Sequence, residues 1–126
     1  RKIFKYKMMN VPIPEYPEVN RGILLVKPTD VFFTYLKSKG FNETDALQPE
    51  DWEPTIYLVP EMDSPLEEDE WTKSNYKSLF SHLLAQTPLD EKDFPPINDF
   101  PLFESWFNCE FIIGIFDMVK GPLGRG

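Results

Sequence analysis

Three short apolar runs along the chain predict the strands of one small sheet. They cover residues 23–26, 55–59 and 109–118, and a proline follows each of the first two. The first run and the centre of the third, residues 111–116, are apolar at consecutive positions, which is typical of strands covered on both faces. We therefore expect these two strands to be neighbours in the middle of the sheet, with residues 55–59 at an edge.

Apolar side chains at spacings of three and four predict three helices. A first helix starts at Thr29 or Asp30, either of which can cap it, and ends at Gly40. The clearest helix covers residues 68–86. Its apolar face consists of Tyr76, Leu79, Phe80, Leu83 and Leu84. A short third helix follows Asp99, a residue type that often caps helices.

The order of these elements is β-α-β-α-α-β, which predicts an α/β (α+β) domain with a small sheet of about three strands and helices packed on the sheet. The helix between the first two strands favours a right-handed parallel crossover, whereas the direction of the third strand stays open. Gly114 interrupts the third run, which indicates a bulge or a tight packing contact. We expect residues 1–21 to be an extended lead-in, residues 22–120 the single domain and residues 121–126 a flexible tail.

The pattern of the chain resembles that of a small bacterial protein family. The segments that carry the resemblance are LLVKP at residues 24–28, YLVPE at residues 57–61 and WFNCEF at residues 106–111. With further apolar and polar positions between them, the resemblance extends over about residues 22–125. The family has no assigned activity, so the resemblance implies a fold and no function.

Charge is unevenly distributed along the chain. The formal net charge is −8, to which residues 1–39 contribute +5 and residues 40–126 contribute −13. An acidic protein repels phosphate groups, so we expect no nucleic-acid partner. The acidic half either keeps the protein soluble or attracts a basic protein as its partner.

One cysteine and the absence of a long apolar run bear on the compartment. Cys109 has no second cysteine with which to form a disulfide, which favours a reducing, cytoplasmic environment. The longest apolar run, residues 111–116, is far too short to span a membrane. We therefore expect neither a membrane partner nor a secretory signal.

No combination of residue types in the sequence points to a catalytic centre, a metal site or a cofactor. The single histidine, His82, lies beside the apolar stripe of the long helix, and the sequence suggests no partner for it. Cys109 is expected to be a packing residue, because the neighbouring Glu110 would raise the pKa of its thiol. We therefore expect no cofactor and lean against an enzyme.

Polar residues at the strand ends are the candidates for ligand binding. In open α/β sheets, ligands gather at the carboxyl ends of parallel strands. Lys27 and Asp30 follow the first strand, and Glu61 follows the second. Asp117 would join them if the third strand is parallel, and Glu110 if it is antiparallel. These residues form either salt bridges or a small-molecule site.

Aromatic and acidic residues near the long helix are the candidates for partner contacts. Trp52 and Trp71 lie in or beside acidic segments, and an aromatic side chain that stays exposed there would mark a contact surface. Glu67, Glu68 and Glu70 make the start of the long helix acidic, a placement that the helix dipole favours without any function.

These features favour a small acidic binding or regulatory module that acts through protein-protein contacts. One alternative is a small enzyme or ligand-binding protein that uses carboxylates and a lysine at the edge of the sheet. Another is a homo-oligomeric structural protein in which an open sheet edge pairs with a second copy, since three strands leave two edges. A deep pocket lined by the strand-end residues would favour the enzyme, and a flat acidic face with exposed tryptophan would favour the binding module.

Overall fold

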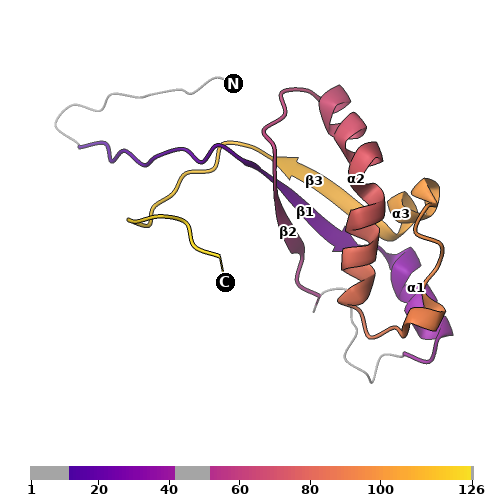
Figure 1. Ribbon diagram of the computed structural model, residues 1–126. Helices are drawn as coiled ribbons and strands as arrows, with labels where there is room; N and C mark the ends of the chain where they lie inside the picture. The colour runs from indigo at the N-terminus through magenta and orange to yellow at the C-terminus, as the bar shows by residue number, and fades with distance from the viewer. Residues whose placement is uncertain (1–11, 42–51, 126) are drawn as a thin grey trace.

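Three antiparallel strands form one sheet in the order β2-β1-β3 (Figure 1). The strands are β1 (Gly22–Pro28), β2 (Thr55–Val59) and β3 (Phe107–Ile112). The computed structural model describes residues 12–41 and 52–125. Within these residues the predicted class, a small sheet with helices packed on it, is confirmed.

The predicted parallel crossover between the first two strands is wrong, because β1 and β2 are antiparallel and Gly22 faces Val59. The reason lies in the intervening helix α1 (Asp30–Ser38), which has nine residues and spans only about 13 Å. It lies beyond the carboxyl end of β1 and does not run back along the sheet (Figure 1). The chain therefore enters β2 from the end at which it left β1.

The two remaining helices begin at capping residues. Helix α2 (Pro65–Ala85) starts three residues before the predicted start, because the Ser64 hydroxyl accepts a hydrogen bond from the Glu67 amide at 3.2 Å. Helix α3 (Phe100–Trp106) follows Asp99, whose carboxylate accepts from the Leu102 amide at 3.0 Å, as predicted. A single turn of 3₁₀ helix, η3 (Glu91–Asp93), lies between α2 and α3.

The hydrophobic core lies between one face of the sheet and the helices. Leu79, Phe80, Leu83 and Leu84 of α2 are buried there, as predicted, and Tyr76 is half-buried. Many of the remaining core residues are aromatic and come from α1, α3 and the start of β3: Phe32, Phe33, Phe103, Trp106 and Phe107.

The other face of the sheet, which we call the open face, is not covered by any described element. Ile56 and Leu58 of β2 are each 55% exposed, and Ile112 of β3 is 39% exposed. By the strand register, Ile23 and Leu25 of β1 share this face with them. The prediction that the apolar strands are covered on both faces is therefore wrong for the described residues.

The predicted strand order is confirmed in part. β1 is central and pairs with β3, and β2 is at an edge, as expected. The expectation that the third strand is also central is wrong, because β3 forms the opposite edge. Its consecutive apolar residues 111–116 do not continue as a regular strand, since β3 ends at Ile112.

Beyond β3 the chain changes register at Gly114. The pairing of Ile23 with Ile112 gives way to a single bridge between Glu18 and Phe116, which is displaced by one residue. Gly114 has φ +82°, a conformation that glycine adopts readily. The predicted interruption at this glycine is thus confirmed. The residues after it pair with the described residues before β1: the Val19 amide donates to the Ile115 carbonyl at 2.7 Å and the Asp117 amide to the Pro17 carbonyl at 2.8 Å (Figure 1).

Candidate functional site: an acidic groove beside a strand edge

A groove of about 660 Å³ lies between the first half of α2, helix α3 and β3. Its apolar part consists of four phenylalanine side chains: Phe100, Phe103, Phe107 and Phe111. Phe103 and Phe107 belong to the hydrophobic core, so the groove has a rigid apolar floor. We call this hollow the acidic groove because of the charges around it.

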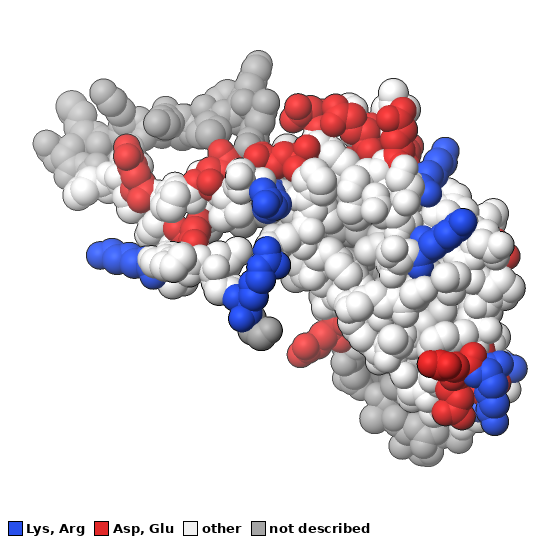
Figure 2. Space-filling view, in the orientation of Figure 1, with Lys and Arg blue, Asp and Glu red and all other residues white. Residues whose placement is uncertain are grey.

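Carboxylates dominate the rim of the acidic groove. Glu68 and Asp69 come from α2, Glu104 from α3 and Glu110 from β3, and Lys73 is the one lysine among the lining residues. Figure 2 shows acidic side chains gathered over the start of α2, whereas the middle of the surface in this view carries few charges. The groove therefore offers negative charge next to aromatic rings, a combination that suits cationic side chains.

The groove also borders an unpaired strand edge. The Thr29 amide donates to the Trp106 carbonyl at 2.8 Å, and this pair continues the register of β1 with β3. Hydrogen-bonded pairs alternate along an antiparallel ladder, so the backbone of Glu110 bonds to β1 and the backbone groups of Cys109 and Phe111 point away from it. No hydrogen bond joins these outward groups to another residue in the described ranges.

The thiol of Cys109 is half-buried in the groove wall and is kept protonated. Burial, and secondly the charge of Glu104, raise its pKa to about 11. The predicted packing role fits this environment, but the carboxylate that raises the pKa of the thiol is Glu104 and not Glu110, as the sequence had indicated. A thiol with so high a pKa is a poor nucleophile at neutral pH.

Tyr57 of β2 and His82, in the last turn of α2, form a separate polar contact. The Tyr57 hydroxyl lies 2.8 Å from Nδ1 of His82, and the side-chain amide of Gln86 lies 3.1 Å from the same atom. Burial raises the pKa of Tyr57 to about 12. The histidine thus has partners, including one four residues along the helix, but none is a nucleophile or a metal ligand. No group of three potential ligands gathers within the described residues.

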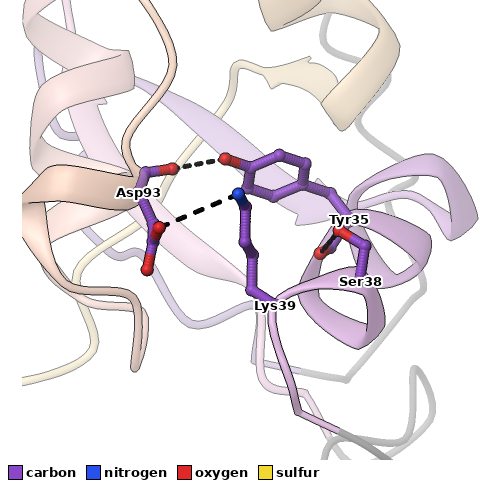
Figure 3. A network of polar contacts seen from close by, with 4 residues as sticks. All are labelled: Tyr35, Ser38, Lys39 and Asp93. Carbon is purple, nitrogen blue, oxygen red and sulfur yellow. Dashed lines mark hydrogen bonds and ion pairs between the residues drawn. The ribbon is translucent and has the colours of Figure 1, made fainter.

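A third polar cluster ties α1 to the turn η3 (Figure 3). The Tyr35 hydroxyl donates to the backbone carbonyl of Asp93, and Nζ of Lys39 lies 3.8 Å from the carboxylate of the same residue. The Ser38 hydroxyl donates to the Tyr35 carbonyl at 2.6 Å. Every group here is engaged with another, so the cluster joins two elements of the fold and offers no free reactive group.

The five strand-end residues predicted to bind a ligand do not come together. Lys27 and Asp30 lie at the carboxyl end of β1, whereas Glu61 follows β2 at the opposite end, about 20 Å away along the strand. Asp117 lies in the segment after β3, where its amide donates to the Pro17 carbonyl at 2.8 Å. Only Glu110 lines the acidic groove. The prediction assumed that the first two strands are parallel, and their antiparallel pairing separates Lys27 and Asp30 from Glu61. The third strand, whose direction was left open, is antiparallel to β1, the case for which Glu110 and not Asp117 was named.

The residues predicted to contact a partner divide into two sets. Glu68 lines the acidic groove, whereas Glu67 and Glu70 are exposed on α2 outside it. The two tryptophans are not exposed anchors. Trp71 is half-buried with its ring edge-on to Phe111 at 6.1 Å, and Trp52 packs against the rings of α1.

Sequence reasoning missed Asp69 and Glu104, as well as the phenylalanine floor of the groove. The sequence does show that residues 68, 69, 72 and 73 share one face of α2, because they recur at the helical spacing. The helical spacing does not predict that α3 and β3 lie beside that face, because their position depends on tertiary packing.

Comparisons with protein-family models, with curated proteins and with solved structures find no match for this chain. The resemblance to a small bacterial family therefore stays a prediction. Within the described residues, no helix is long and apolar enough to cross a membrane.

The raised pKa values predict lower stability in alkali. Above pH 9 the unfolded chain begins to lose the Cys109 proton and then the Tyr57 proton, while the folded chain keeps both until pH reaches about 11 and about 12. The free energy of unfolding therefore falls as pH rises through this window. Urea denaturation at a series of pH values measures it. The double variant Cys109→Ala, Tyr57→Phe should lose less stability over this pH window. If its free energy of unfolding fell with pH as steeply as that of the unchanged chain, Cys109 and Tyr57 would not be the cause.

Proposed function

We propose that this chain is a protein-binding module that holds a basic segment of a partner protein in the acidic groove. The observation that carries the proposal is the composition of the groove, in which four carboxylates and one lysine surround phenylalanine rings. In this proposal the acidic half of the chain contacts the partner through the acidic groove. The aromatic contacts come from the phenylalanines of the groove and not from Trp52 and Trp71.

The chemistry of the groove supports a lysine- or arginine-rich ligand. The methylene stems of these side chains pack on aromatic rings, while their charged ends stay near water and carboxylates. A cation above a ring face gains about 0.5–2 kcal/mol, depending on how far it is desolvated. An acidic ligand would instead meet the repulsion of Glu68, Glu104 and Glu110.

A binding role also fits the polar groups of the described residues better than catalysis does. The thiol of Cys109 is held protonated, the histidine is bonded to Tyr57 and Gln86, and the strand-end carboxylates are far apart. These groups do not form the nucleophile, base and orienting residue that a hydrolytic site requires. The enzyme alternative therefore lacks a supporting constellation in the described part of the chain.

A titration with short peptides tests the proposal. The probe is a dye-labelled peptide of about six residues in which lysine and threonine alternate, a length close to that of an ordinary strand. Its control carries glutamate in place of lysine. Fluorescence anisotropy should show binding of the basic peptide alone. The affinity should fall as salt is raised to 0.1 M and above, where charges are screened beyond about 10 Å. Equal binding of the two peptides, or none, would contradict the proposal.

The open face of the sheet favours a second candidate, self-association. Ile56, Leu58 and Ile112 are more than a third exposed on this face, and contiguous apolar surface of this kind often marks an interface. Sedimentation of the protein alone separates the two functions. Self-association through the open face would be weakened by Leu58→Glu, whereas binding in the acidic groove would not.

A further inference from the structure

The acidic groove runs along the backbone edge of β3 and not over one face of the sheet. Its lining includes every residue from Phe107 to Phe111. Successive side chains of a strand point to opposite faces. A hollow that touches all five residues must therefore follow the edge itself, over a length of about 17 Å.

Only one of the two sheet edges is suited to pairing. At the edge of β2, Pro54 and Pro60 flank the strand, and proline cannot donate to a ladder. The edge of β3 has no proline from residue 107 to residue 112. There the N–H and C=O groups of Cys109 and Phe111 point away from β1 and are unpaired among the described residues.

Resting on the proposed function, we infer that the partner's basic segment binds as an extended strand added antiparallel to β3, with lysine or arginine at alternate positions. Backbone hydrogen bonds to Cys109 and Phe111 supply affinity without regard to sequence, as in other cases of strand addition. The carboxylates beside the edge of β3 then select which side chains of the partner's segment bind there.

Strand geometry fixes which residues of the added segment meet which charges. The residues that bond to Cys109 and Phe111 lie directly opposite them and send their side chains to the helix-covered face. That face is the groove side, where Glu68 and Glu104 lie, so these positions take lysine or arginine. The intervening residues send their side chains to the open face beside Glu110 and direct their amides toward solvent.

Methylation of peptide backbone amides tests this arrangement on the intact chain. The alternating lysine-threonine peptide is made in three forms: unmodified, N-methylated at the lysines, and N-methylated at the threonines. The two methylated forms have the same composition. Methyl groups on the lysine amides block the bonds to β3 and should weaken binding about tenfold or more, because each replaces a hydrogen bond with a clash. Methyl groups on the threonine amides face solvent and should change affinity less than about threefold.

The outcomes separate the strand inference from the proposed function. If the unmodified peptide binds and both methylated forms bind equally well or equally poorly, the strand inference is wrong while the basic preference of the groove stands. A stronger effect at the threonines would also overturn it, because the side-chain assignment would be reversed. If the unmodified peptide fails to bind, both the proposed function and the strand inference are contradicted.

Discussion

Replacement of Phe80 by alanine should lower the free energy of unfolding by about 3–5 kcal/mol. The Phe80 side chain is fully buried. Its ring centroid lies 5.5 Å from that of Phe103, 5.7 Å from that of Trp106 and 6.0 Å from that of Phe107. The substitution removes these contacts and leaves a cavity where α2, α3 and β3 meet.

Chemical denaturation of the two proteins measures this effect. Leu66→Ala is the matched control, because Leu66 belongs to the same helix and is 67% exposed. The control should change stability by less than about 0.5 kcal/mol. A denaturation midpoint that barely moves for Phe80→Ala would show that the packing of α2 against α3 and β3 contributes little to the fold.

The helices and strands could be predicted because local patterns determine them. The apolar face of α2 follows from the spacing of Leu79, Phe80, Leu83 and Leu84, and the start of α3 follows from Asp99. The direction of β2 could not be predicted in this way. It depends on whether the helix after β1 runs back along the sheet, and the position of α1 beyond the sheet is a matter of tertiary packing.

The covering of the sheet was mispredicted for a related reason. Consecutive apolar residues in β1 indicate two apolar faces, and both faces are indeed apolar. The apolar pattern of a strand does not show whether another helix or strand covers each of its faces. In the part of the chain that the structure describes, α1, α2 and α3 contribute to the core that contains Leu24 and Val26. Ile23 and Leu25 are left on the open face.

Only some residues of the acidic groove could be predicted from the sequence. Glu68 and Glu110 were singled out for different reasons, and the fold brings both to one groove. Their convergence requires β3 to be an edge strand beside the start of α2. The strand-end rule that selected Lys27, Asp30, Glu61 and Asp117 holds for parallel sheets and has no force in an antiparallel one.

Charge reversal in the acidic groove tests whether a basic segment binds there. The double variant Glu68→Lys, Glu104→Lys changes two carboxylates of the groove, and Glu67→Lys, Glu70→Lys makes the same change in charge on α2 outside it. Binding of the alternating lysine-threonine peptide is measured for both variants and the unchanged chain, after denaturation has shown that each variant is folded.

The groove variant should bind the peptide more weakly by about 2 kcal/mol, or roughly thirtyfold in Kd, because two attractive contacts become repulsive. The control variant should lose only long-range attraction, which slows association and costs roughly threefold in Kd. Equal losses for the two variants would mean that net charge alone attracts the peptide. That result would contradict the assignment of a binding site to the groove.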